Sequence, residues 1–86
     1  MQVQIPTPLR SYTGGEKYVD ATGITLDDLL VDLDRRFPGI RFRVVDEQGR
    51  LRRHMRIFVN QAIEDELSRP IAGDDEVVLM QALSGG

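Results

Sequence analysis

The residues of this 86-residue chain whose type and position could do chemistry are the last two, Gly85 and Gly86. Glycine has no Cβ and tolerates φ on either side of zero, so a terminal pair could pass through a narrow channel in a partner protein. There it would present the α-carboxylate of Gly86, which becomes reactive once ATP converts it to an acyl adenylate. Attack by a sulfur nucleophile would then give a thiocarboxylate. Two glycines can also end a domain without any role, so the pair alone does not decide.

Composition leaves few other groups for chemistry. The absence of cysteine excludes disulfides, cysteine-based zinc sites and a cysteine nucleophile, and a single histidine, His54, cannot build a metal site. The carboxylate pairs at 27–28 and 74–75 are explained by a helix N-terminus and a turn. We therefore expect a protein that is not an enzyme, with no metal and no cofactor bound by this chain.

Net charge and hydropathy limit the partners. A formal net charge of −3 disfavours general nucleic-acid binding. No apolar run approaches the roughly 18 residues that a membrane span requires, and residues 1–10 do not resemble a signal peptide. The sequence predicts a cytoplasmic monomer with neither a nucleic acid nor a membrane as partner.

Positive charge is concentrated between residues 41 and 56. This segment holds six arginines against two acidic residues, Asp46 and Glu47. We interpret it as a solvated face, with docking on acidic partner surfaces as the alternative. The arginines are Arg41, Arg43, Arg50, Arg52, Arg53 and Arg56.

Alternation predicts a strand over residues 3–9 that is short or lies at an edge, because Pro6 and Pro8 limit pairing. A turn at 13–15 and a second strand over 17–21 would complete a hairpin. A helix over 26–36 follows, with Thr25 as N-cap. Its apolar face is Leu26, Leu29, Leu30, Leu33 and Phe37, and Asp28, Asp32, Arg35 and Arg36 are expected on the other side.

The second half of the chain predicts further strands. Residues 40–51 could form a short helical turn or an irregular strand. Strands are expected over 55–60 and 76–83, with a turn at 60–61 and a brief return at 63–64. This order predicts an α+β fold of the β-grasp (ubiquitin-like) type, a mixed four- to five-stranded sheet with one main helix on one face. The domain would cover residues 1–83, followed by a Ser-Gly-Gly tail at 84–86.

Three segments resemble the ubiquitin-like sulfur carrier family (ThiS/MoaD) along the whole chain. They are Phe-Val-Asn-Gln at 58–61, Gly-Asp-Asp-Glu-Val at 73–77 and the final glycine pair. The segments 5–10, 13–15, 38–40 and 46–51 are most similar to the branch that serves cysteine biosynthesis and natural-product sulfur incorporation. Gln81 and Ala82 stand where the small subunit of molybdopterin synthase typically has two prolines, which disfavours that alternative.

The resemblance implies a cycle on Gly86. An ATP-dependent, ubiquitin-activating-type enzyme would adenylate the carboxylate, and a sulfur donor would convert it to a thiocarboxylate. An acceptor enzyme, such as a cysteine synthase or the synthase of a thio-metabolite, would then take the sulfur. Alternatives are the molybdopterin synthase small subunit, a protein modifier conjugated through Gly86, and a plain β-grasp interaction module. Lys17 is the only lysine through which a modifier could form chains.

A carrier needs a surface that its partners recognise. If Ile57, Val59, Val77 and Leu79 face the helix, alternation places their neighbours on the open side of the sheet. An exposed apolar cluster there would be a candidate interface, although some of its members could instead pack under the 40–51 segment. The expected partner-binding residues are Phe58, Ile63, Val78, Met80, Leu83 and Ser84.

Overall fold

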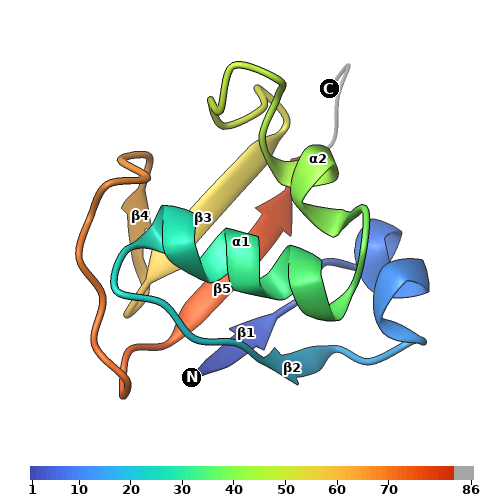
Figure 1. Cartoon of the computed structure of the whole chain (residues 1–86), viewed down its shortest axis with the longest axis horizontal. Helices are drawn as coiled ribbons and strands as arrows, with labels where there is room; N and C mark the ends of the chain where they lie inside the picture. The colour runs from blue at the N-terminus through green and yellow to red at the C-terminus, as the bar shows by residue number, and fades with distance from the viewer. Residues whose placement is uncertain (83–86) are drawn as a thin grey trace.

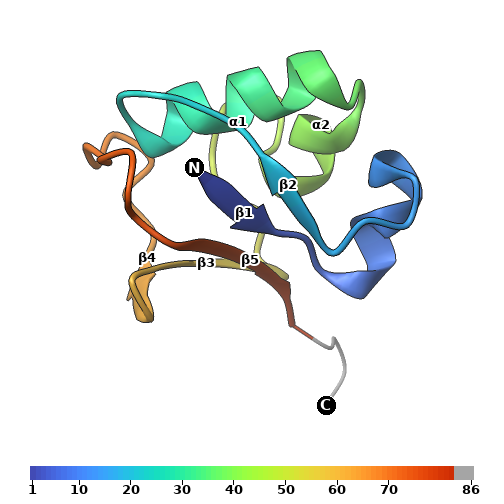
Figure 2. The same cartoon turned by 90° about the horizontal axis from the view of Figure 1, so that it is seen from below.

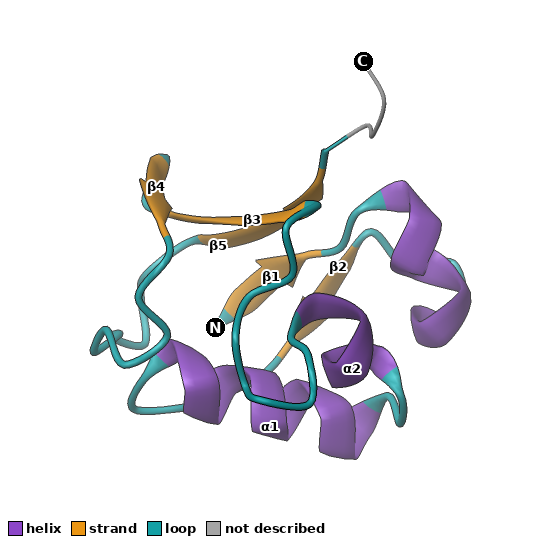
Figure 3. Ribbon diagram, turned by 90° about the horizontal axis from the view of Figure 1, so that it is seen from above, coloured by secondary structure: helices purple, strands orange, loops and turns teal. Residues whose placement is uncertain are grey.

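The computed structural model describes residues 1–82, which form one five-stranded sheet covered on one face by helices (Figure 1). Helices α1 and α2 lie on the same side of the sheet, and the opposite face of β3 and β5 carries no element (Figures 2 and 3). The elements are β1 (Gln2–Gln4), the 3₁₀ helix η1 (Thr7–Thr13), β2 (Tyr18–Asp20), α1 (Leu26–Arg36), α2 (Ile40–Val44), β3 (Met55–Val59), β4 (Ala62–Glu64) and β5 (Val77–Gln81).

The sheet has the order β2-β1-β5-β3-β4. Strands β1 and β5 pair in parallel, with Val3 opposite Val77, and the other neighbouring pairs are antiparallel. The first and last strands of the chain therefore lie side by side in the middle of the sheet, with α1 packed across them. This mixed sheet with one main helix confirms the predicted β-grasp architecture.

Helix α1 has the predicted bounds, and its ends explain them. The Thr25 Oγ1 accepts a hydrogen bond from the Asp28 N–H at 3.2 Å, which satisfies one of the free donors of the first turn. Asp27 and Asp28 lie in the first turn and Arg35 and Arg36 in the last, as the helix dipole favours. The apolar face is buried against the sheet at Leu26, Leu29, Leu30 and Leu33.

The predicted position of Asp32 on the solvent side of α1 is wrong. Only 5% of this residue is exposed, because its carboxylate turns towards the loop before the helix. Asp32 Oδ2 accepts hydrogen bonds from the Thr22 N–H and from Arg36 Nε, each at 2.9 Å, and Oδ1 pairs with Arg35. The Thr22 N–H, followed by Arg36 and Arg35, holds the pKa of Asp32 far below its usual range. The carboxylate thus ties the loop to the helix.

The N-terminal segment also departs from its prediction. The strand ends at Gln4 instead of continuing to residue 9, and residues 7–13 form η1. Proline fixes φ near −65° and lacks an N–H, so Pro6 and Pro8 suit the first turn of a helix better than a strand. The short strand is not at an edge, since β1 lies between β2 and β5. The turn at 13–15 is confirmed, with positive φ at Gly14 and Gly15.

Both interpretations of residues 40–51 hold in part. Residues Ile40–Val44 form the short helix α2, and an isolated antiparallel bridge then joins Val45 to Leu51. Strands β3 and β5 are shorter than predicted but in the predicted places, and β4 begins one residue before the predicted return at 63–64. The turn after β3 has positive φ at Asn60 and Gln61. Within residues 1–82, no helix has both the length and the apolar character needed to cross a bilayer.

Candidate functional site

Strand β5 leads the chain from the centre of the sheet towards its C-terminal end. The Ala82 N–H donates a hydrogen bond to the carbonyl of His54 at 2.6 Å, so the last described residue lies beside the start of β3. His54 itself is exposed. The predicted reactive residues Gly85 and Gly86, and the predicted contact residues Leu83 and Ser84, lie outside the described residues. The site that can be described is therefore the surface at the C-terminal end of β5, around Ala82, which we call the exit of β5.

An apolar patch occupies the open face next to this exit. Phe58 pairs with Val78 on one side and with Ile63 on the other, and residues directly opposite in antiparallel strands share a face. Ile63 is 62% exposed and Met80 46%, whereas Phe58 and Val78 are half-buried. We call these four residues the open-face patch. The alternating residues Ile57, Val59, Val77 and Leu79 are at most 2% exposed, so the predicted division between the two faces is confirmed.

A basic border adjoins the open-face patch. Arg56 lies directly opposite Met80 in the β3–β5 register, so it shares the open face with the patch. Its Nη1 donates to the carbonyls of Arg53 at 2.8 Å and Met55 at 2.9 Å. Arg52 is also held by a carbonyl, because its Nε donates to Phe42 O at 2.7 Å. Its guanidinium further stacks over the Phe42 ring, 4.6 Å from the centroid.

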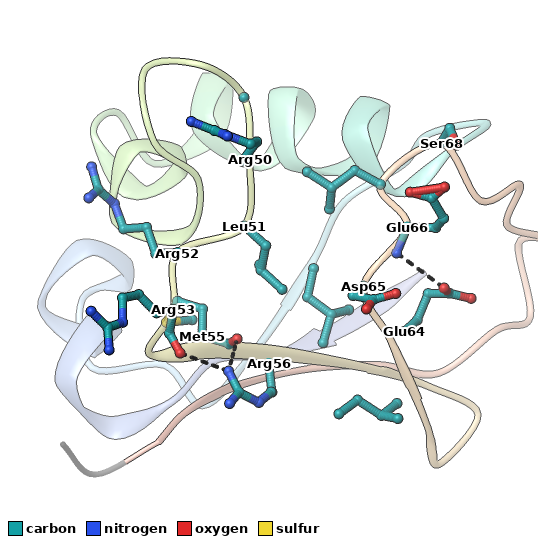
Figure 4. Close-up of a pocket in the computed structure, with 14 residues that line it drawn as sticks. Arg50, Leu51, Arg52, Arg53, Met55, Arg56, Glu64, Asp65, Glu66 and Ser68 are labelled. Atoms are coloured by element: carbon teal, nitrogen blue, oxygen red, sulfur yellow. Dashed lines mark hydrogen bonds between the residues drawn. The ribbon is translucent and has the colours of Figure 1, made fainter. Parts of the chain in front are cut away.

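A groove of about 740 Å³ separates these arginines from an acidic segment (Figure 4). Arg50, Arg52 and Arg53 lie on one side of it, and Glu64, Asp65 and Glu66 lie on the other. The apolar side chains of Leu51, Met55, Ile57, Ile63 and Leu67 also line it. The groove is therefore divided into a basic and an acidic half. No group of three metal-ligating side chains occurs among residues 1–82.

A contact that the sequence did not reveal fixes the start of β5. Asn60 Nδ2 donates to Asp75 Oδ1, and the Glu76 N–H donates to Asn60 Oδ1, both at 2.9 Å. Asp75 Oδ2 also accepts from the Ala72 N–H at 2.8 Å, and this bond, with the one from Asn60, lowers the pKa of Asp75. The turn interpretation of Asp75 is thus confirmed. The 58–61 and 73–77 motifs contain both partners, but their spacing gives no sign that they bond to each other.

The fold, with its helix-covered and open faces and a last strand at the centre of the sheet, defines a ubiquitin-like β-grasp protein. The chain belongs to the ThiS family, whose model matches residues 3–86. It is 39% identical over 89 residues to the sulfur carrier protein CysO of Mycobacterium tuberculosis, covering 98% of this chain and 96% of that protein.

Solved structures give the same result. A chain in the crystal structure of the Amycolatopsis orientalis BexX/CysO complex has a TM-score of 0.90 and 35% identity, covering 99% of this chain and 98% of that one. The structure of SAMP1 from Haloferax volcanii, a protein at 28% identity, has a TM-score of 0.80 and covers 100% of this chain and 98% of that one. Both cover essentially the whole domain, so the likeness is not confined to a motif.

Proposed function

We propose that this chain is a sulfur carrier that works through the carboxylate of Gly86. Membership of the ThiS family along residues 3–86 carries the proposal, together with 39% identity to proteins named sulfur carrier CysO. In this role the chain is a co-substrate of partner enzymes and performs no catalysis of its own. It binds no cofactor, and ATP is consumed by the activating partner.

The chemistry would proceed in two balanced steps. A carboxylate oxygen of Gly86 attacks the α-phosphorus of ATP, and pyrophosphate leaves with the electrons of the broken P–O bond. A sulfide-level sulfur then attacks the carbonyl carbon of the adenylate, and AMP leaves to give the thiocarboxylate. The thiocarboxylate sulfur would then bond to a substrate of an acceptor enzyme, in cysteine or thio-metabolite synthesis, and water adding at the acyl carbon would release the sulfur with that substrate and return the carboxylate. The open-face patch and residues 83–84 would hold the two enzymes.

Mass spectrometry tests this proposal. The full chain is incubated with ATP, sulfide and an activating enzyme of the ubiquitin-activating type, and the expected gain is the mass difference between one sulfur and one oxygen atom. A chain lacking Gly85 and Gly86 is the matched control and should gain nothing. No gain by the full chain, with an enzyme shown to activate another ThiS-family protein, would refute the carrier function.

The likeness to a small archaeal modifier protein supports one alternative. A modifier would use the same adenylate, but the nucleophile would be a lysine amine of another protein and the product an amide. Proteomic detection of Gly86 linked to lysines, with no thiocarboxylate captured by an electrophilic probe, would favour this alternative over sulfur transfer.

A further inference from the structure

The arginines beside the exit of β5 differ from several other charged groups in what holds them. Asp32 is bound by Arg35 and Arg36, Arg41 Nη2 pairs with Asp27 at 3.1 Å, and Glu64 pairs with Arg69 at 3.0 Å. By contrast, no ion pair involves Arg52, Arg53 or Arg56 among the residues that the structure describes. We call these three residues the arginine rim.

Two members of the arginine rim are positioned by neutral acceptors. Arg52 donates a hydrogen bond from Nε to a carbonyl, and its guanidinium stacks on the Phe42 ring. Arg56 donates only from Nη1, to two carbonyls. Their remaining N–H groups point to no acceptor within residues 1–82. Each guanidinium therefore keeps its remaining donors free, while much of its conformational freedom is already lost. Such a side chain binds a carboxylate with a small entropic cost.

The backbone that carries the arginine rim is also fixed. Asp46 Oδ1 accepts hydrogen bonds from the N–H groups of Gln48 and Arg50, both at 2.9 Å, and this closes the turn before the rim. The Arg52 N–H then donates to Val44 O at 3.0 Å. These bonds hold the segment against helix α2, so the rim is a built surface rather than a free loop.

The position of the rim indicates what it would bind. Arg56 borders the open-face patch at Met80, and Arg53 precedes His54, whose carbonyl holds Ala82. A partner that covers the patch and receives the C-terminal residues must therefore pass over the rim. The acidic half of the groove, with Asp65 and Glu66, would repel carboxylates and restrict them to the rim side.

We propose that the arginine rim binds a carboxylate-rich surface of the partner protein that takes the C-terminal residues. This inference rests on the proposed function for the identity of the partner, and on the rim alone for the chemistry it recognises. Complementary charge near a docking patch raises the association rate and fixes orientation more than it adds affinity. Because the groove has a basic and an acidic half, a partner that docked in the reversed orientation would place like charges against both halves.

Titration of the ¹⁵N-labelled full chain with an oligoglutamate peptide at low salt tests the rim. Amide shifts should centre on residues 50–56 and disappear at high salt, because exposed charges are screened. The double variant Arg53→Glu/Arg56→Glu should bind roughly tenfold more weakly, since each exposed ion pair contributes a fraction of a kcal/mol. Lys17→Glu is the control for a charge reversal outside the rim, to be compared with the single variant Arg53→Glu: the lysine is exposed, lies before the edge strand β2, and its reversal should leave binding unchanged.

Three outcomes would overturn the proposal: no localised shifts, equal weakening in the Lys17→Glu control, or displacement of the peptide by tripolyphosphate at lower concentration. The last would assign the rim to phosphate groups. The spectra report directly whether each variant is folded, and the milder Arg53→Gln/Arg56→Gln should give an intermediate loss. If the chain gains sulfur but does not bind oligoglutamate, only the proposal for the arginine rim is refuted. If it binds oligoglutamate but gains no sulfur, only the carrier function is refuted.

Discussion

The ten residues of β3 and β5 alternate between two faces of the sheet, and these faces differ in exposure and in polar contacts. On the covered face every side chain except Gln81 is at most 2% exposed, and in helix α1, which packs on that face, the Asp32 carboxylate accepts hydrogen bonds from Thr22, Arg35 and Arg36. On the open face Met80 is 46% exposed beside Arg56, which forms no ion pair with any of residues 1–82. A domain this small cannot cover both faces, so strand alternation separates residues that stabilise the fold from residues left for contact.

The largest effect on stability is expected from truncation on the covered face. Leu79→Ala would remove a side chain that is 1% exposed and should lower the free energy of unfolding by about 2–5 kcal/mol. Val78→Ala, one residue earlier on the open face, is the matched control and should cost clearly less. Urea unfolding of both variants makes the measurement. Equal losses would mean that the two faces do not differ in the way described.

A smaller loss is expected where α1 docks against the loop before it. A Cβ added to Gly23 would lie 2.5 Å from the Leu29 backbone nitrogen, so Gly23→Ala must displace the helix. Overpacking of this kind costs about 1–3 kcal/mol. Gly73→Ala is the control, since nothing lies within 4 Å of its added Cβ. Thermal unfolding should separate the two substitutions, and an unperturbed Gly23→Ala would contradict the close packing.

Acid should remove the stabilisation that the buried carboxylate of Asp32 provides. Because folding lowers the pKa of Asp32, its stabilisation is present above the unfolded pKa of about 4 and is lost as the pH falls below it. Asp32→Asn should therefore unfold at a lower temperature at neutral pH and show a weaker decline below pH 4. Asp65→Asn, at an exposed acidic residue, should follow the wild-type pH curve. The midpoint of thermal unfolding measured against pH distinguishes them.

The smallest effect on stability is expected on the open face, with the largest effect on activation. Met80→Asp should change the free energy of unfolding by no more than about 0.5 kcal/mol, as is usual for surface substitutions. It should still raise the carrier concentration needed for half-maximal adenylation, because a charge would be buried against an apolar partner surface. Pyrophosphate release by the activating enzyme is the readout. Unchanged release would remove the open-face patch from the proposed interface.

How far the sequence predicts this molecule depends on whether the signal is local. Helix α1 carries its cap, its dipole charges and its leucine spacing within its own residues, and its bounds were predictable. Alternation in β3 and β5 likewise separated Ile57 from Phe58. Asp32 was misplaced because its partner Thr22 lies ten residues away, across a loop whose path the sequence does not encode locally. The prolines at 6 and 8 were read as limits on a strand, although their fixed φ also suits a helical turn.

Within the candidate site the same distinction holds. The arginine-rich segment was visible as composition, but whether its charges were paired required the surrounding carbonyls and carboxylates. The hydrogen bonds between Asn60 and Asp75 and between Asn60 and Glu76 link residues that are fifteen and sixteen positions apart. Only the β3–β5 pairing brings these residues together. The role proposed for residues 83–86 is inferred from the sequence and from membership of the family.

The parallel pairing of β1 with β5 has a consequence for how the protein is made. Residues 3 and 77 must meet in the middle of the sheet, so the central pairing waits until the segment that contains residue 77 has left the ribosome. A nascent chain that stalls before residue 77 lacks the strand on which both β1 and β3 rely, and it should remain a substrate for proteases. Quality control would thus act before any incomplete carrier could occupy an activating enzyme without a group to activate.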